Sequence, residues 1–193
     1  GDFILALINC NNTNSEIQKQ SEEFLFKVKE QDFFGYLNAL LLVIQEASVD
    51  QLPKNLALIL SWKTLQDITL QDPTISKYQF IEDNSPGLLE HYLTTSMSLF
   101  STLSLQSANL FSCVTSIVAR FNEQCDIIKS LLEQLDSTTD FDFFTGAFYA
   151  LFNITEEFDL EPENYQPILS KIFTIFNDQE VPLEIKSLSL KIL

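Results

Sequence analysis

The feature that most constrains this fold is a succession of apolar stripes at helical spacing, separated by short polar breaks. Apolar residues recur at steps of three and four along most of the chain, which places them on one face of each helix. An aromatic stretch shows this spacing most clearly; its members are Phe141, Phe144, Phe148 and Phe152. The pattern predicts an all-α protein made of short helices joined by short turns.

Composition supports the same fold class. The chain has 193 residues, of which 46% are apolar and 20% are charged, so it has ample material for a core and is not expected to be disordered. It contains only four Gly and six Pro, whereas a β-sandwich or barrel needs turn residues every ~8–12 positions. The glycines are also far apart in the sequence, which excludes a Gly-rich phosphate-binding loop.

Capping residues predict where the helices begin. We expect Asp32 and Asp50 each to cap a helix, and Ser85-Pro86 to form the N-cap and first position of another. Pro162 and Pro182 are expected to open the last two helices. The residues expected to point inward include Ile17, Phe24, Leu25 and Val28 in the second helix, Leu52, Leu56, Ile59 and Leu60 in the fourth, and Ile168, Ile172 and Phe176 in the penultimate one.

The helices also recur as pairs. Ile127 and Ile168 are 41 residues apart, and so are Phe144 and Ile185. A two-helix unit that repeats at ~40–47 residues is typical of HEAT and armadillo proteins, in which stacked pairs bury a continuous core. Residues 69–84 are then expected to be a long linker between successive pairs of one segment that spans residues 1–193. A closed helical bundle is the alternative architecture.

The charge balance limits the possible partners. Twenty-seven acidic residues against eleven basic ones give a net charge of −16. Nucleic acids and anionic membrane surfaces need a basic footprint, and the sequence has none. The acidic charge suits a basic protein partner or simply solubility. No apolar run reaches the ~18–20 residues of a membrane-spanning helix, so membrane insertion is not expected.

Catalytic and metal-binding patterns are missing. The three cysteines lack the paired spacing of a disulfide framework or a zinc site. His91 is the only histidine, so it is the only histidine base that could activate a nucleophilic side chain. The carboxylates around residues 156–163 have no EF-hand arrangement, so a solvated loop is favoured there over a cation site. We therefore expect neither an enzyme nor a cofactor. Phe143 and Tyr149 lie off the aromatic stripe and are candidates for exposed aromatics that bind a partner.

Lys27 and Lys63 stand out because basic residues are scarce. Each follows the apolar stripe of its helix, so each side chain either neutralises the negative C-terminal end of that helix or contacts a partner.

Several segments resemble the amino-terminal HEAT repeats of importin beta, of the karyopherin family. A short leading helix over residues 3–8 precedes a polar helix with Glu23-Phe24-Leu25, and Phe34-Gly35-Tyr36-Leu37 then leads into an aliphatic run. Residues 56–64 are similar to the family's apolar stretch that ends in Leu-Lys-Asn. Residues 107–119 are similar to its third repeat, and residues 184–188 to the second helix of its fifth.

Two positions depart from the family pattern. The family usually has an acidic residue and Pro after the third repeat, followed by Trp-Pro, where this chain has Arg120-Phe121-Asn122 and Cys125-Asp126. Thr64 stands where the family has Asn after its lysine.

The resemblance implies a right-handed α-solenoid of about five HEAT-type antiparallel helix pairs. It implies a nuclear transport receptor fragment that binds the GTP form of Ran through the concave face of its first repeats, with Lys27 and Lys63 as candidate contacts. Ile172 falls in a helix that would form half of a pocket for Phe-Gly nucleoporins. The intact receptor would also bind basic cargo or importin alpha, and would act in the cytoplasm, the nucleus and the nuclear pores. The alternative is a HEAT scaffold of another class, such as a phosphatase regulatory subunit or a coat adaptor.

Overall fold

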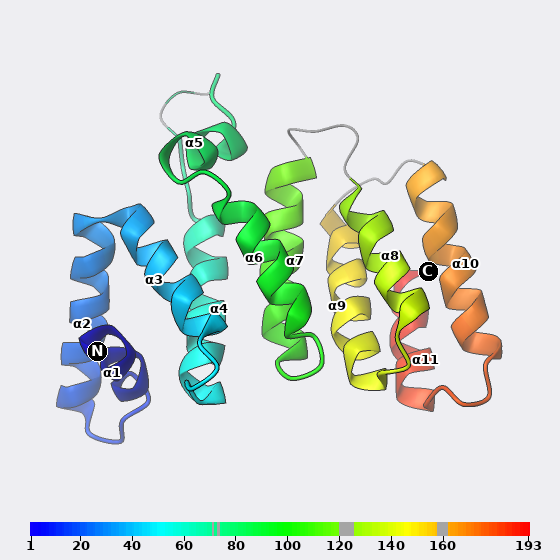
Figure 1. Ribbon diagram of the computed structural model, residues 1–193, viewed down its shortest axis with the longest axis horizontal. Helices are drawn as coiled ribbons and strands as arrows, with labels where there is room; N and C mark the ends of the chain where they lie inside the picture. Colours follow the sequence, from blue (N-terminus) through cyan, green and yellow to red (C-terminus); the bar gives the residue numbers. More distant parts are fainter. Residues whose placement is uncertain (71, 73, 120–125, 158–161) are drawn as a thin grey trace. The chain divides into compact units, whose positions relative to one another are not determined.

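The computed structural model describes residues 1–70, 72, 74–119, 126–157 and 162–193 (Figure 1). All regular structure within these ranges is helical, which confirms the predicted all-α class. The chain divides into two compact units, Gly1–Thr95 and Ser96–Leu193. The helices that begin in the first unit are α1 (Asp2–Asn9), α2 (Ser15–Gln31), α3 (Phe33–Gln45), α4 (Gln51–Gln66), α5 (Lys77–Asn84) and α6 (Leu88–Ser98). The second unit contains α7 (Ser104–Ala119), α8 (Ile127–Ser137), α9 (Phe141–Glu157), α10 (Pro162–Asn177), α11 (Leu183–Ser189) and a 3₁₀ turn, η1 (Leu190–Ile192).

Short polar side chains fix the starts of the first long helices. The side chain of Asn14 accepts a hydrogen bond from the Glu16 N–H at 2.9 Å, so α2 begins at the next residue after this cap. Asp32 accepts one from the Gly35 N–H at 2.8 Å and caps α3 as predicted. Asp50 is the N-cap residue of α4, although its side chain makes no capping hydrogen bond.

The prediction of a long connection over residues 69–84 is wrong in its second half, which forms α5. Ser76 caps this helix by accepting a hydrogen bond from the Gln79 N–H at 3.0 Å. Only Ile81 of α5 is buried, so the segment has almost no apolar stripe for periodicity to detect.

The prediction that Ser85-Pro86 opens the next helix is also wrong, because α6 begins at Leu88. Gly87 lies between them with a φ of 75°, in the left-handed region that favours glycine. The Gly87 N–H donates to the Glu82 side chain at 3.0 Å, which holds the turn against the preceding helix.

The core of the first unit is organised around α3, against which α2 and α4 both pack, while α1 contacts α2 and α4. Leu37, Leu40 and Ile44 of α3 are fully buried. The buried Tyr92 hydroxyl donates to the Leu37 carbonyl at 2.7 Å and lies 3.0 Å from the Ser61 hydroxyl. This network joins α3, α4 and α6 inside one core.

Two predicted inward faces are wrong in the first unit, that of α2 in part and that of α4 at all four predicted residues. Of the four residues expected on α2, only Leu25 is buried, and Phe24 remains 39% exposed. The buried residues of α4 are Pro53, Ala57, Leu58, Ser61, Thr64 and Leu65. Of the residues expected on α4, Leu52 is 52% exposed, and Leu56, Ile59 and Leu60 are only half-buried. Because residues 56–60 are all apolar, their pattern fits more than one face of α4.

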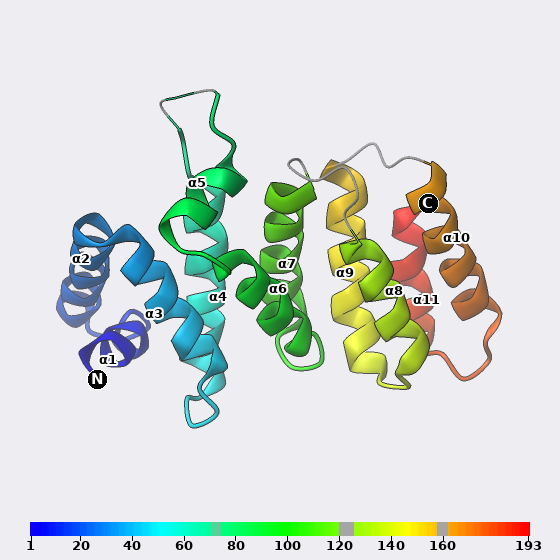
Figure 2. The same ribbon diagram turned by 45° about the horizontal axis from the view of Figure 1, so that its top comes forward.

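The second unit is built from stacked helix pairs (Figures 1 and 2). Helix α8 packs on α9 and α10 on α11, while α7, α9 and α11 form one row and α8 and α10 another. The 41-residue spacing found in the sequence links helices that occupy equivalent places in successive pairs. Ile127 and Ile168 lie in α8 and α10, and Phe144 and Ile185 lie in α9 and α11.

Aromatic packing fills the space between α7 and α9. The Phe100 ring packs against Phe111 and Phe143, with ring centroids 5.4 and 5.5 Å away. Phe143 was predicted to be exposed, but it is half-buried against Phe100; that it binds a partner stays a prediction. A Cβ at Gly146 would lie 2.5 Å from the Phe100 Cβ, so α9 passes Phe100 at a distance that only glycine permits.

The inward face of α10 also differs in one position. Ile168 and Ile172 are buried as expected, but Ile175 takes the third place and Phe176 is exposed. Lys171 of α10 reaches α8, where its ammonium group lies 2.6 Å from the Asp136 carboxylate. The third-repeat junction that departs from the importin pattern lies outside the described residues, except for its last residue.

Candidate functional site

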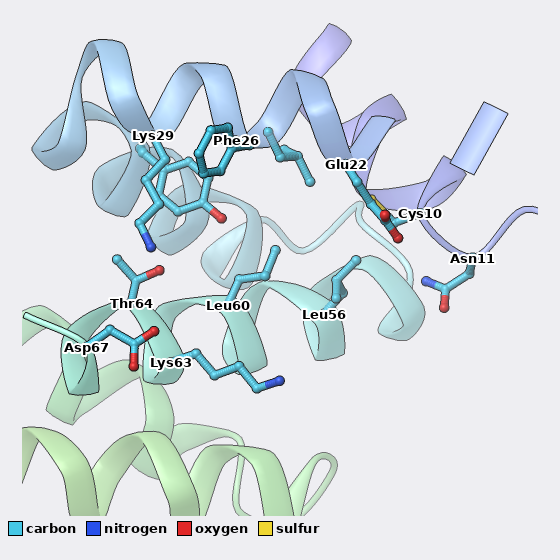
Figure 3. Close-up of a pocket in the computed structure, with 12 residues that line it drawn as sticks. Cys10, Asn11, Glu22, Phe26, Lys29, Leu56, Leu60, Lys63, Thr64 and Asp67 are labelled. Atoms are coloured by element: carbon cyan, nitrogen blue, oxygen red, sulfur yellow. The ribbon is translucent and has the colours of Figure 1, made fainter. Parts of the chain in front are cut away.

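A pocket of about 440 Å³ lies between α2 and α4 in the first unit (Figure 3). Helix α2 supplies one wall, α4 the other, and the turn after α1 closes one end. We call this site the α2–α4 groove. Its lining residues are Cys10, Asn11, Glu22, Leu25, Phe26, Lys29, Tyr36, Leu56, Leu60, Lys63, Thr64 and Asp67.

Helical spacing positions the side chains of both walls. On α2, Glu22, Phe26 and Lys29 follow at steps of four and three, so they share one face. On α4, Leu56 and Leu60 are four residues apart and continue the same kind of stripe towards Lys63. Each wall therefore places apolar side chains in the middle of the groove and charged groups beside them.

The centre of the groove is apolar and accessible. Phe26 is 59% exposed although it lies over a pocket that is also lined by Leu56 and Leu60. An exposed Phe is not unusual by itself, but its clustering with aliphatic side chains around a concavity is typical of a binding surface.

The charged groups of the groove differ in their hydrogen-bond and ion-pair partners. The Glu22 carboxylate accepts a hydrogen bond from the Gln18 side chain at 3.0 Å. Lys29 reaches across from α2 towards Thr64 of α4 and towards Asp67, the residue that follows α4 (Figure 3). Among the described residues, neither Lys29 nor Lys63 has a carboxylate within salt-bridge distance of its ammonium group. The groove thus presents two cationic side chains that are available to a ligand.

A second concavity of about 260 Å³ adjoins the groove. It shares Lys29, Thr64 and Asp67 with the groove and adds the aromatic side chains of Phe33 and Phe80. The shared residues place the two concavities next to each other, and Lys29 lines both.

The titratable groups at the closed end of the groove are poorly suited to acid–base chemistry at neutral pH. Burial, together with the negative charge of Glu22, raises the pKa of the Cys10 thiol, which keeps it protonated and weakly nucleophilic. Burial also raises the pKa of Tyr36 to about 12, with a smaller contribution from Cys10. Neither group is prepared for proton transfer or nucleophilic attack.

The residues singled out in the sequence fall at different places. Lys63 lines the groove, whereas Lys27 is exposed on α2 and does not line it. Ile172 is buried in α10 of the second unit. Sequence reasoning missed Lys29, which occupies the last turn of α2, the position that had been considered for Lys27.

Tyr149 and His91 complete the list of sequence candidates. Tyr149 is half-buried and lines a small hollow of about 180 Å³ beside Lys191 in the second unit. His91 is exposed on α6.

The residues that the structure describes contain no group of three or more His, Cys, Asp or Glu side chains arranged to hold a metal ion. Their helices are also all too short or too polar to cross a membrane.

A scan against protein-family models found no matching family, and searches of the curated proteins and of the solved structures found no match either. The resemblance to importin beta depends on the sequence segments given above.

Proposed function

We propose that this chain is a non-enzymatic, HEAT-type protein-binding module, the first repeats of an importin beta-like nuclear transport receptor. Its partner is the GTP form of the small GTPase Ran, which it binds on the face that contains the α2–α4 groove. Nucleoporin and cargo binding by the intact receptor, and its presence in the cytoplasm, the nucleus and the nuclear pores, belong to the same proposal.

The packing of the second unit supports the repeat type. Successive antiparallel pairs, α8–α9 and α10–α11, stack so that first helices contact first helices and second helices contact second helices. This is the arrangement by which HEAT pairs bury their apolar faces. Continued through the chain, such pairs amount to about five repeats of a right-handed solenoid.

The observation that carries the proposed function is the chemistry of the groove. An exposed Phe26 and the available ammonium groups of Lys29 and Lys63 lie together on α2 and α4. These are two of the helices that the importin resemblance assigns to the Ran-binding surface. Aromatic side chains are enriched at protein–protein interfaces, and Phe26 lies with aliphatic side chains around a concavity.

Binding of this kind works by differential affinity. A surface that fits the ordered switch loops of the GTP state binds the GDP state weakly, so hydrolysis releases the partner without any chemistry on the receptor. The raised pKa values of Cys10 and Tyr36 favour binding over acid–base chemistry in the groove.

A capture experiment tests the proposal. The full chain is immobilised and offered Ran loaded either with a non-hydrolysable GTP analogue or with GDP, and its helicity is verified by circular dichroism. We expect retention of the GTP form only, and a loss of retention when Lys63 is changed to Glu. Equal capture of both forms, or capture of neither by a folded sample, would reject the Ran proposal and favour a HEAT scaffold of another class.

A further inference from the structure

Exposed apolar side chains gather on the face of α10 that points away from α8. Phe173 is 59% exposed, and together with the exposed Phe176 and the half-buried Leu169 it forms a stripe at steps of four and three. Lys171, which reaches α8, precedes Phe173 by two residues and therefore points in nearly the opposite direction. Helix α10 thus buries one apolar stripe and presents a second one to solvent.

The 41-residue spacing shows what the corresponding face does elsewhere in the unit. Phe173 and Phe176 stand 41 residues after Leu132 and Leu135 of α8, and both leucines are buried. Helix α10 packs on α8, where the Lys171 ammonium group donates to the Leu135 carbonyl at 3.0 Å. The face that is open on α10 therefore corresponds to a face that another helix covers on α8.

Helix α11 and the turn after it continue this apolar surface. Leu183 is 76% exposed and lies two residues before the buried Ile185, so it points away from the core. Leu190 follows Leu183 after seven residues, about two helical turns, and is also exposed. It stands 41 residues after Tyr149, which lines the hollow between α9 and α11. Both helices of the pair thus expose the positions that the preceding pair turns towards its neighbour.

We propose that this surface binds the same surface of a second copy of the chain, which produces a two-fold symmetric dimer. We call it the α10–α11 edge, and its residues are Leu169, Phe173, Phe176, Leu183 and Leu190. The inference does not depend on the proposed partner Ran, because the groove assigned to Ran lies in the first unit.

The distribution of the apolar side chains selects the occupant. Helices α10 and α11 lie side by side at one end of the second unit, and both contribute to the edge (Figures 1 and 2). A single amphipathic helix would cover only one of the two stripes. A second copy supplies a pair of helices with the same apolar edge, and a two-fold axis lets each copy cover the other. The dimer continues the packing of pair on pair that the second unit already contains.

The net charge of −16 opposes this association. All five edge residues are uncharged, so the attraction comes from apolar burial, while the repulsion comes from carboxylates spread over both copies. Salt screens repulsion between exposed charges and leaves apolar burial in place. The dimer should therefore become tighter as the salt concentration rises.

Sedimentation velocity of the full chain over a range of concentrations tests the proposal. We expect an equilibrium of monomer and dimer without larger species, and a smaller dissociation constant at higher salt. Phe173→Ser and Leu183→Ser should each raise the dissociation constant about a hundredfold, since every substitution enters the symmetric interface twice. Both side chains are exposed, so the variants should fold, which circular dichroism verifies.

Phe24→Ser and Leu42→Ser are the matched controls, because both residues are exposed on helices of the first unit. Neither should change the dissociation constant. A series of growing oligomers that Phe24→Ser abolishes would mean that the edge binds the first unit of another copy, and it would overturn the two-fold dimer. A chain that remains monomeric at about 100 μM, or a dimer that Phe173→Ser leaves intact, would overturn the proposal as well. None of these outcomes bears on the capture of Ran.

Discussion

The buried hydroxyl of Tyr92 should be one of the larger single contributors to the stability of the first unit. It donates to the Leu37 carbonyl at 2.7 Å and lies 3.0 Å from the Ser61 hydroxyl, with no exposed surface on its residue. Burial raises the pKa of Tyr92, so the hydroxyl stays protonated and keeps its role as a donor. Tyr92→Phe removes this oxygen and leaves the ring in place.

The expected cost follows from the groups left behind. A buried polar group that loses its partner costs about 1–3 kcal/mol. Ser61 can turn its hydroxyl to a carbonyl of its own helix, which recovers part of that cost. We therefore expect a loss of roughly 2 kcal/mol, and since m is about 1–3 kcal/mol/M in urea, the midpoint should fall by about 1 M.

Trp62 makes the measurement selective. It is the only tryptophan of the chain and lies on α4, so its fluorescence during urea unfolding reports on the first unit. Tyr36→Phe is the matched control, because the Tyr36 hydroxyl makes no hydrogen bond to a described residue although its residue is 3% exposed. A Tyr92→Phe midpoint that coincides with that of Tyr36→Phe would refute the reasoning.

Two further predictions concern the second unit. Gly146→Ala places a Cβ 2.5 Å from the Phe100 Cβ and should destabilise by about 1–3 kcal/mol despite the better helix propensity of Ala, which calorimetry would show as a lowered transition temperature. Asp140 accepts hydrogen bonds from Ser101 at 2.6 Å and from the Asp142 N–H at 2.9 Å, and the Ser101 bond is the main cause that lowers the Asp140 pKa. A carboxylate with a lowered folded pKa stabilises above its unfolded pKa and loses that contribution as pH falls through the folded value. Unfolding midpoints measured from neutral pH to below pH ~3.8 should therefore fall more steeply for the wild type than for Asp140→Asn, and equal slopes would contradict this.

The sequence was informative where apolar periodicity and a cap agreed. Helix α3 has both, since Asp32 caps it and the apolar residues Leu37, Leu40 and Ile44, which follow at helical spacing, are buried. The spacing of the helix pairs was informative as well. The 41-residue repeat of apolar stripes corresponds to the stacking of α8 on α10 and of α9 on α11.

Prediction failed where one signal stood alone. Ser85-Pro86 has the composition of a helix start, but Gly87 adopts a positive φ and moves that start to Leu88. Helix α5 has a capping Ser76 but hardly any apolar stripe, and so it was taken for a linker. On α4 the stripe was so broad that it did not identify a single buried face.

The candidate site was missed because it depends on how α2 is rotated about its axis. Successive residues of a helix differ by ~100°, so residues two apart, such as Lys27 and Lys29, point in nearly opposite directions. Only the packing of α2 decides which of them faces the groove, and Leu25 and Ser21 are the residues that α2 buries. Phe26 lies one position after Leu25, at the border of that buried face, where it extends over the groove. The prediction of Ile17 and Phe24 as inward residues placed the buried face of α2 incorrectly, because both are exposed. Predicting the groove requires knowing how α2 is rotated about its axis. The buried Ser21 helps to set that rotation, and a search for apolar stripes does not detect it because serine is polar.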